Sequence, residues 1–288
     1  MTSLAKMLSI LDLFAADHPQ WSAEEVCESL DFSRPTGYRY VKELVDAGLL
    51  QRVSNGYYVL GPRIILLDYQ IRMADPVLRA AIPLMRDLVE QTGCDCVISA
   101  IYGNQLLDIH RESGNEHLDL SYGRGRPRPL FQGAAPKVIL SALPRTRLKK
   151  IYDGFADEIA QRGLGQDWEG FRAFMAKVRK TGYYLSIGEL EADLSAIAAP
   201  LMSSDTDVVG AISLVTSTKR MQLMDRAMVT ELIQRNAAFI SAQIGAAPTL
   251  PATAATATVA AAGGVSEATT SSQTDTPRKR PRKGKQSP

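Results

Sequence analysis

The sequence predicts a mixed α/β (α+β) protein with two folded parts and a tail. Short helical periods and a hairpin signal occupy residues 1–61, and a helical linker follows over 62–75. Strand-like and helix-like periods alternate over 76–245. The segment 246–288 is rich first in Ala and Thr and then in Pro, Lys and Arg. It has no apolar periodicity with which to bury a core, so we predict a disordered tail.

The charge is unevenly distributed along the chain. The 288 residues carry a net charge of +2, but the tail holds six Lys and Arg residues against Glu267 and Asp275, a net +4. The remainder carries −2, so any contact of the folded parts with a polyanion must come from a local patch. No apolar run reaches the roughly 18 residues of a membrane helix, and we identify no secretory signal. These features predict a cytoplasmic protein without a membrane partner.

Chemistry-bearing motifs are scarce. Cys27, Cys94 and Cys96 are an odd number of cysteines without framework spacing, which indicates a reducing compartment. Cys94-x-Cys96 offers half of a metal site, but no second Cys or His cluster completes it. A Gly-x-Ser-x-Gly elbow, a His-Glu-x-x-His pair and nucleotide-binding glycine motifs are all missing from the sequence. We expect no metal, no cofactor and no enzymatic activity.

Local signals in the first part predict three helices. Apolar residues at helical spacing over 4–14 indicate an amphipathic helix that ends near His18. Ser22 and Glu25 form a capping box that opens a second, short helix. After a tight turn at 31–33, we expect the Ser33 side chain to cap a third helix that tolerates Pro35 in its first turn and runs to about Ala47. The face of this helix that points toward the core is expected to be Gly37, Tyr40, Val41 and Leu44.

A hairpin follows the third helix. Asn55-Gly56 lies between two strand-like runs, and a type I′ turn needs a positive φ at both central positions. Helix, helix, turn, helix and hairpin in this order are the layout of a winged helix-turn-helix. A groove-inserted helix needs cations for phosphates and side chains that reach base edges near its N-terminus. The candidate DNA-binding residues are Ser33, Arg34, Pro35, Thr36, Tyr38, Arg39 and Lys42, with Arg52 on the wing. The alternative interpretation is a merely solvated helix face.

A series of motifs in order resembles the IclR-type transcriptional regulators over about residues 4–245. The segments that carry the resemblance are 21–26, 33–44, 56–63, 123–130, 133–140, 182–184, 188–191 and 197–200. The resemblance implies a sheet-based effector pocket like that of a GAF domain, and dimers that pair further as tetramers. Two residues depart from it. Gly37 stands where a bulky apolar residue is usual, at a helix-propensity cost of about 1 kcal/mol, and Pro136 replaces a glycine before Lys137.

The second part is expected to combine strands and helices. A linker helix stops at Asp75-Pro76, and Tyr102-Gly103-Asn104 turns the chain between the first two strands. We predict helices over 77–91, 133–143, 145–153, 167–181 and 220–244, and strands over 94–101, 105–111, 183–189, 195–202 and 207–216.

The sequence favours an anionic effector. The basic loop Arg124-Gly125-Arg126-Pro127-Arg128 leads into the helix that starts near Gly133. Free N–H groups and the positive end of the helix dipole at this point favour a carboxylate or phosphate. The alternative is that the arginines are solvated or pair with acids at an oligomer interface. With the resemblance, the expected effector-binding residues are Arg128, Leu130, Ala134, Ala135, Ser186, Leu194, Ala196 and Ser213.

Several polar residues are given no role in the site. We expect His110 at the surface or the edge of the core, Asp108 and Glu112 in solvent, and the acids at 189–193 bounding a strand and a loop. The sequence thus predicts a regulator that binds an operator in double-stranded DNA as a homodimer or homotetramer and responds to a small organic acid, with aromatic acids among the candidates. The alternative is a constitutive DNA-binding protein whose second domain only oligomerises. The tail either adds weak phosphate contacts or acts as a solubilising appendage.

Overall fold

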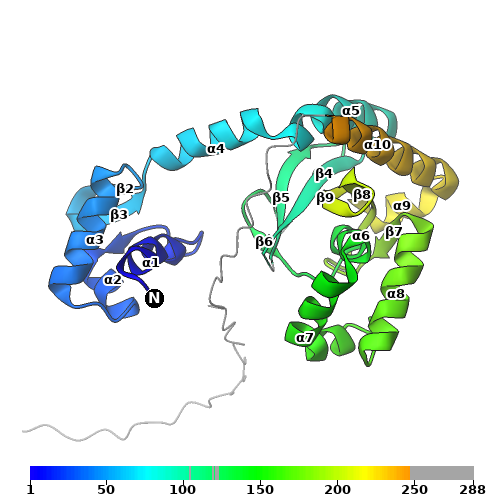
Figure 1. The fold of residues 1–288 in the computed structure, drawn as a ribbon. Coiled ribbons are helices and arrows are strands. Elements are labelled where there is room, and N and C mark those ends of the chain that lie inside the picture. The colour runs from blue at the N-terminus through cyan, green and yellow to red at the C-terminus, as the bar shows by residue number, and fades with distance from the viewer. Residues whose placement is uncertain (104, 119, 121–122, 247–288) are drawn as a thin grey trace, which may run out of the picture. The chain divides into compact units, whose positions relative to one another are not determined.

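The computed structural model describes residues 1–103, 105–118, 120 and 123–246 (Figure 1). The predictions about the tail, apart from Ala246, therefore concern residues outside the described part of the chain. Within the described part, no helix is both long enough and apolar enough to cross a membrane.

The N-terminal part is built from short helices and a small sheet. Its core contains Ile10, Val26, Val41, Leu44 and Leu50. The sheet has the order β1-β3-β2, and its neighbouring strands are antiparallel. The strand β1, which pairs with the wing, is not among the sequence predictions. The elements are α1 Ser3–Leu8, η1 Ser9–Leu13, β1 Trp21–Ser22, α2 Ala23–Ser29, α3 Arg34–Asp46, β2 Leu50–Arg52, η2 Ser54–Gly56 and β3 Tyr57–Leu60.

The first predicted helix is shorter than its apolar pattern suggests. It tightens into the 3₁₀ turn η1 and ends at Leu13 instead of continuing to His18. The indole N–H of Trp21 donates to the Leu13 carbonyl oxygen at 3.0 Å, which satisfies a group left free at the helix end. A tertiary contact thus replaces the last turn of the predicted helix.

The capping predictions have two different outcomes. The box at Ser22 is confirmed, because the Glu25 N–H donates to its hydroxyl at 3.2 Å and the Ser22 N–H donates to the Glu25 carboxylate at 2.7 Å. Ser33 does precede α3, but the expected side-chain cap is wrong: its hydroxyl donates to Thr36 Oγ1 at 2.9 Å instead. In the wing, Asn55 and Gly56 have φ values of 61° and 80°, as the turn signal predicts.

Gly37 allows α2 and α3 to approach closely. A Cβ atom at this position would lie 2.3 Å from the Sγ atom of Cys27, a buried residue of α2. The thiol therefore occupies the volume that a larger side chain at position 37 would need. The unusual glycine is explained by this packing.

A linker helix leaves the N-terminal part and a second helix follows directly. α4 spans Arg63–Ala74, and α5 spans Pro76–Thr92. The Asp75 carboxylate caps α5 by accepting from the Val77 N–H at 2.8 Å, and Pro76 begins this helix, where its missing N–H costs no hydrogen bond. The predicted stop at Asp75-Pro76 is confirmed.

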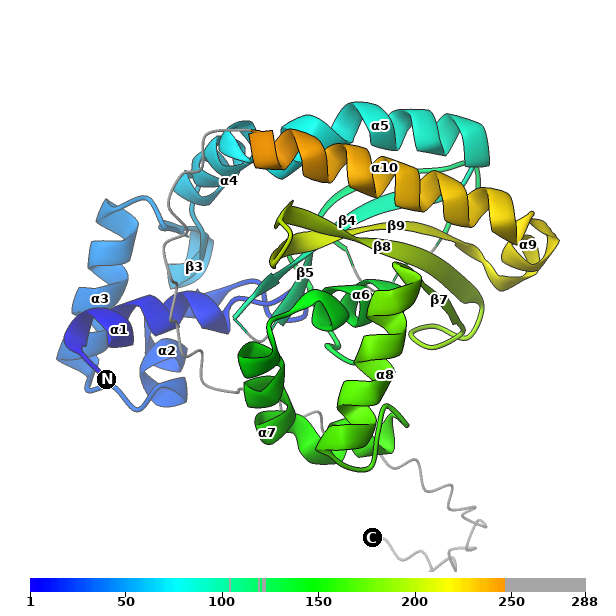
Figure 2. The same cartoon turned by 45° about the vertical axis from the view of Figure 1, so that its right-hand side comes forward.

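The second part is a six-stranded sheet covered by helices on both faces (Figure 2). Its order is β6-β5-β4-β9-β8-β7, and neighbouring strands are antiparallel. Side chains such as Ile98 pack with α5 and α10, whereas Ala198 packs with α6 and α8 on the other face. The strands are β4 Asp95–Tyr102, β5 Gln105–Glu112, β6 Pro127–Arg128, β7 Tyr184–Ile187, β8 Leu194–Ser204 and β9 Asp207–Ser217. The remaining helices are α6 Ala134–Ala142, α7 Arg145–Gln161, α8 Trp168–Thr181, α9 Thr218–Leu223 and α10 Arg226–Ala246.

Two helix predictions in this part need correction. α7 continues to Gln161 instead of ending near residue 153, with a non-helical residue at Phe155 inside it. The last predicted helix is two helices, α9 and α10: the chain is extended at Met224, directly after α9, and Asp225 caps α10 by accepting from the Ala227 N–H at 2.9 Å.

Candidate DNA-binding face and effector pocket

The two faces of α3 are divided as the sequence predicts. Gly37, Tyr40, Val41 and Leu44 are buried. The opposite side carries exposed Arg34, Tyr38, Arg39 and Lys42, together with exposed Ser33 and Pro35 and half-buried Thr36. Arg52 is exposed on β2. The predicted DNA-binding residues thus lie on the surface of one short helix and its wing, apart from the partly covered Thr36.

Side-chain contacts fix parts of this face. The Tyr38 hydroxyl donates to the Glu24 carboxylate, which raises the pKa of Tyr38 and lowers the pKa of Glu24. The guanidinium group of Arg39 lies 5.4 Å from the centre of the Tyr40 ring, within the range of a cation–π contact. The Tyr40 hydroxyl is in turn 2.7 Å from Ser3 Oγ on α1. The face is therefore supported by both neighbouring helices.

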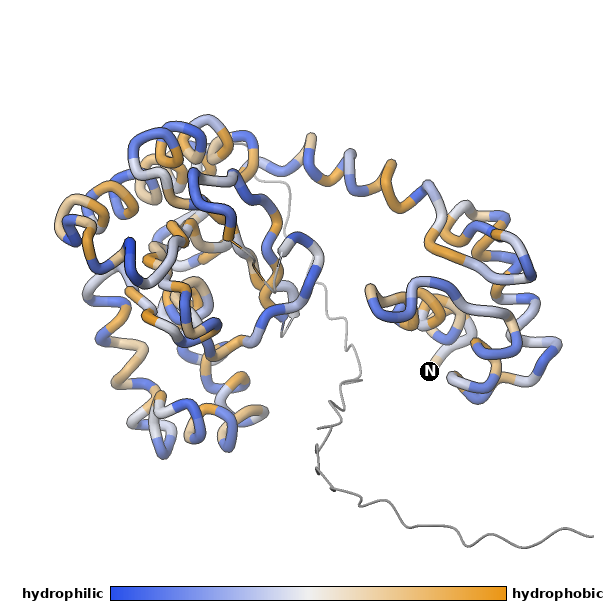
Figure 3. Tube along the Cα trace, turned by 180° about the vertical axis from the view of Figure 1, so that it is seen from behind, coloured by the Kyte–Doolittle hydropathy of each residue, from blue (hydrophilic) through white to orange (hydrophobic). Residues whose placement is uncertain are grey.

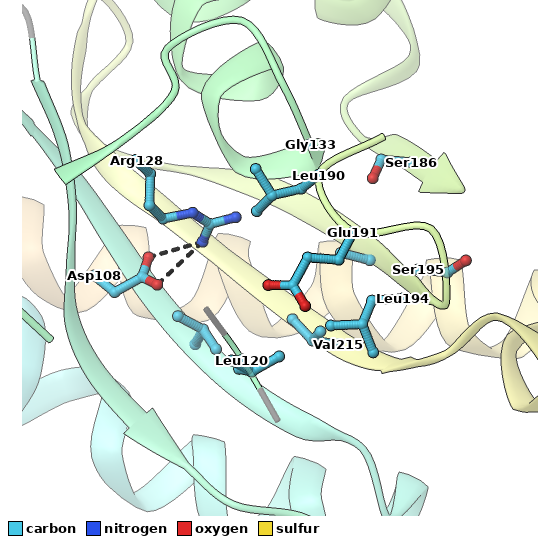
Figure 4. A pocket seen from close by; sticks show the side chains of 12 residues that line it. Asp108, Leu120, Arg128, Gly133, Ser186, Leu190, Glu191, Leu194, Ser195 and Val215 are labelled. Atoms are coloured by element: carbon cyan, nitrogen blue, oxygen red, sulfur yellow. Dashed lines mark hydrogen bonds and ion pairs between the residues drawn. The ribbon is translucent and has the colours of Figure 1, made fainter. Parts of the chain in front are cut away.

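A pocket lies against the α6 face of the six-stranded sheet, under the loop that joins β7 to β8 (Figure 4). Its empty space, part of it open to solvent, is about 470 Å³. The lining residues are Val97, Asp108, Leu120, Arg128, Gly133, Ser186, Leu190, Glu191, Leu194, Ser195, Ala196 and Val215.

Arg128 and Asp108 form a buried ion pair in the wall of the pocket. Arg128 Nη1 donates to both carboxylate oxygens of Asp108, at 2.9 and 3.1 Å, and the two side chains are 11% and 7% exposed. The Ser99 hydroxyl donates to the same carboxylate at 2.7 Å. The expectation that Asp108 is solvated is therefore wrong. It follows Leu106 by two residues on β5, so the alternation of the strand places both on the inner face.

The N-terminus of α6 already holds a carboxylate of the same chain. Glu189, in the β7–β8 loop, accepts from the Gly133 N–H at 3.1 Å, from the Tyr184 hydroxyl at 3.0 Å and from the Lys137 ammonium group. Burial lowers the pKa of Lys137 and the Glu189 charge opposes that shift, whereas burial and then Glu189 both raise the pKa of Tyr184. The helix end that the sequence offers to a ligand anion is thus occupied by Glu189.

Other cations near the pocket are also paired within the chain. Arg124 donates to Asp68 of α4 and to the Ile109 carbonyl oxygen of β5. His110 lies at the edge of the core, within 3.0 Å of Glu112 Oε1 and 3.3 Å of Arg72. The Glu112 side chain, expected in solvent, is only 24% exposed and is partly covered. Within the described residues, no group of three or more His, Cys, Asp or Glu side chains is arranged to hold a metal ion.

The expected effector-binding residues fall into three groups. Arg128, Ser186, Leu194 and Ala196 line the pocket, whereas Leu130, Ala134 and Ala135 belong to the buried core around α6. Ser213 is 2% exposed on β9, and the described residues provide no hydrogen-bond partner for its hydroxyl. It is two residues from Val215, a lining residue, and therefore points to the same face of the sheet.

The exposed cationic helix and the second domain with its pocket define a class of protein, the one-chain DNA-binding regulators with a ligand-binding domain. The family model for the IclR helix-turn-helix domain matches residues 3–54, and that for the bacterial transcriptional regulator IclR C-terminal domain matches residues 73–242. The chain belongs to the IclR family. Members of this family are transcriptional regulators and not enzymes.

Known proteins similar to this chain agree with that assignment. It is 26% identical over 247 residues to the HTH-type transcriptional regulator KipR of Bacillus subtilis, covering 84% of this chain and 97% of KipR. It is 26% identical over 224 residues to the Pca regulon regulatory protein of Pseudomonas putida, covering 76% of each. A solved IclR homolog from Microbacterium hydrocarbonoxydans, complexed with 4-hydroxybenzoate, shares the fold with a TM-score of 0.67 at 21% identity, covering 85% of this chain and 100% of that one.

Proposed function

We propose that this regulator places the exposed face of α3 in the major groove of an operator and that a small aromatic acid bound in the pocket controls the outcome. The observation that carries the first half is the cationic surface of α3, with Arg34, Arg39 and Lys42 exposed beside the wing residue Arg52. Cations of this kind bind phosphates, and side chains in the first turns of a recognition helix reach base edges.

We propose a homodimer as the unit that binds DNA. Not one residue of α4 is buried in the described chain, and Ile65, Leu66, Tyr69 and Ile71 are 73%, 64%, 62% and 61% exposed. The helix contains four consecutive apolar residues, 64–67, and Figure 3 shows apolar stretches along it. An exposed apolar surface of this extent favours a protein partner, and a second copy of the chain would supply a second α3 for the other half of a partly palindromic operator.

The pocket supports the second half of the proposal. Among the described residues, its walls combine apolar side chains with the guanidinium group of Arg128 and the carboxylates of Asp108 and Glu191. Arg128 is the group there that can bind the charge of a small organic acid. The solved relative complexed with 4-hydroxybenzoate makes an aromatic acid the first class to test. We propose that the bound acid changes the separation or mobility of the paired winged helices through the 62–75 linker, where Asp68 of α4 is bonded to Arg124.

The DNA half is tested by fluorescence anisotropy with the DNA upstream of the protein's own gene. We expect tighter binding to this duplex than to a shuffled duplex at moderate salt. Arg39→Ala is expected to weaken specific binding by about 1–3 kcal/mol if Arg39 reads a base, and nearly uniformly across sequences if it contacts phosphate. Arg147→Ala, at an exposed position of α7, is the matched control. Equal affinity for both duplexes contradicts the proposal.

The paired cations of the pocket favour one competing function, a constitutive DNA-binding protein whose second domain only oligomerises. Arg128 and the α6 N-terminus both hold carboxylates of the chain itself. The two functions differ in one measurement. An effector-controlled regulator changes its operator affinity in the presence of the acid, whereas the constitutive protein binds the operator equally well with and without it.

A further inference from the structure

Arg128 is the cation among the described residues that line the pocket, and its hydrogen-bonding capacity is incompletely used. A guanidinium group has five N–H donors in a rigid planar arrangement. Nη1 binds Asp108, but Nε is buried and has no hydrogen-bond partner among the described residues. Buried donors are nearly always paired, so an unpaired one in a pocket wall points to an acceptor that enters from outside.

Asp108 is suited to positioning the guanidinium group rather than to binding the ligand. It is 7% exposed and is itself held by the Ser99 hydroxyl. Both of its hydrogen bonds come from Nη1, so neither engages the edge of the guanidinium group that carries Nε. A carboxylate that meets this edge can accept two parallel hydrogen bonds, the geometry that arginine favours for carboxylates.

The other anion site suggested by the sequence is closed. Glu189 occupies the N-terminus of α6 through Gly133 and is bonded to Lys137, whose side chain is 3% exposed. A ligand carboxylate would have to displace Glu189 and leave a buried ammonium group without its counterion, which is unfavourable. Arg128 is therefore the better position for the ligand's negative charge.

Glu191 offers a second polar contact. Its side chain extends into the pocket toward the Arg128–Asp108 pair, with Leu194 and Val215 beside it (Figure 4). A carboxylate has about four lone-pair positions, so Glu191 can accept a hydrogen bond from a ligand in addition to its existing contact. A ligand that carries only negative charge is disfavoured next to this acid, whereas one with an O–H or N–H donor is favoured.

We propose that Arg128 binds the effector's carboxylate through its Nε edge and that Glu191 accepts a hydrogen bond from a donor on the same molecule. The pocket thereby selects a hydroxy- or amino-substituted aromatic acid over the unsubstituted one. This inference rests on the proposed effector-controlled function. It adds the chemical class of the ligand, the residue that binds its carboxylate and the residue that binds its hydrogen-bond donor.

The first test compares ligands on the full-length wild-type chain by calorimetric titration. The probes are benzoate, benzamide and the three hydroxybenzoate isomers. We expect at least one hydroxybenzoate to bind about tenfold or more tightly than benzoate, as a hydrogen bond to a charged group allows. Benzamide, which lacks the charge, should bind more weakly than benzoate. Benzamide and benzoate of equal affinity would overturn the assignment of Arg128.

The second test changes the residues. Arg128→Gln is expected to weaken all the acids about tenfold or more, with Arg147→Gln on α7 as the exposed control. Arg128→Gln leaves Asp108 without its counterion. The double variant Asp108→Asn/Arg128→Gln removes both charges and avoids this imbalance. Thermal unfolding shows whether the double variant folds. Glu191→Ala should remove the advantage of the hydroxybenzoate while leaving benzoate binding undiminished. An unchanged advantage in Glu191→Ala overturns the role of that residue.

The outcomes separate this inference from the proposed function. Wild-type protein that binds its operator but binds no aromatic acid contradicts the proposed effector class and this inference together. Acids that bind both wild type and a folded Arg128→Gln variant equally leave the proposed function standing and refute the inference. Binding that survives Arg128→Gln and becomes tighter in Glu189→Gln would place the carboxylate at the α6 N-terminus instead, where Glu189 competes with it, and refute the inference as well.

Discussion

The recognition face of α3 and the effector pocket both depend on arginine, but they present it differently. Arg34, Arg39 and Lys42 are exposed, and no described carboxylate forms an ion pair with any of them. Arg128 is buried against Asp108. A polyanion is bound by accessible cations that release counterions, whereas a small ligand requires a cation fixed in one orientation. Exposed cations therefore suit DNA binding, and a buried, paired arginine suits the binding of a small ligand.

The largest effect is expected from removing the partner of the buried arginine. Asp108→Ala leaves the Arg128 guanidinium group buried without a counterion, so we expect the free energy of unfolding to fall by about 3 kcal/mol. Urea unfolding measures the change, and Asp87→Ala, at an exposed position of α5, is the control. Equal unfolding midpoints for the two variants would show that the pair contributes nothing to stability.

A smaller effect is expected where α2 and α3 meet. Gly37→Ala places a methyl group against the Cys27 thiol, so we expect the free energy of unfolding to fall by about 2 kcal/mol through overpacking. Cys27→Ala in the same chain removes the sulfur and should restore part of the loss. A double-mutant cycle by thermal unfolding measures this coupling. Strictly additive losses would mean that the clash is relieved elsewhere.

The capping box of α2 should contribute less. Ser22→Ala removes the hydroxyl cap and is expected to cost about 1 kcal/mol. The hydrogen bond from the Ser22 backbone N–H lowers the pKa of Glu25 in the folded protein. The stabilisation from this hydrogen bond is therefore present above the pKa of Glu25 in the unfolded chain. It is lost as the pH falls through the pKa of Glu25 in the folded protein. A Glu25→Gln variant with the same acid dependence as wild type would contradict this account.

The smallest effect on stability is expected on the recognition face itself. Arg39→Ala should change the free energy of unfolding by no more than about 0.5 kcal/mol, although the same variant is expected to lose operator affinity. Comparing its thermal unfolding with its anisotropy titration separates the two quantities. A large loss of stability would show that Arg39 supports the fold through its contact with Tyr40 and would remove it as a dedicated DNA contact.

Features of this chain that depend on near neighbours are predictable from its sequence. The Ser22 box, the buried face of α3 and the positive φ values at Asn55 and Gly56 all involve residues within a few positions of one another. Each of these three features follows from the residue types in a short stretch of sequence, and the structure confirms all three. Two predictions for the N-terminal part fail. The end of the first helix depends on the bond from Trp21 to Leu13, which joins separate elements. The Ser33 cap fails although it is local, because the hydroxyl donates to Thr36 Oγ1 instead.

The pocket is less predictable because its ion pairs and hydrogen bonds join residues that are far apart in the sequence. Asp108 and Arg128 are 20 residues apart, and Glu189 is 56 residues from Gly133. Only the resemblance to a family indicated Ser186, Leu194 and Ala196 as lining residues. The alternation of β5 contained a usable signal, since Asp108 shares the phase of buried Leu106. Nothing local marks Glu189 as the group that covers the end of α6.

The packing of Cys27 beneath Gly37 has an evolutionary consequence. A larger residue at position 37 requires a smaller one at position 27, because the Cys27 sulfur fills the volume that a Cβ atom at position 37 would need. Among homologous regulators we expect the two sites to vary together, with bulk at one accompanied by a smaller residue at the other.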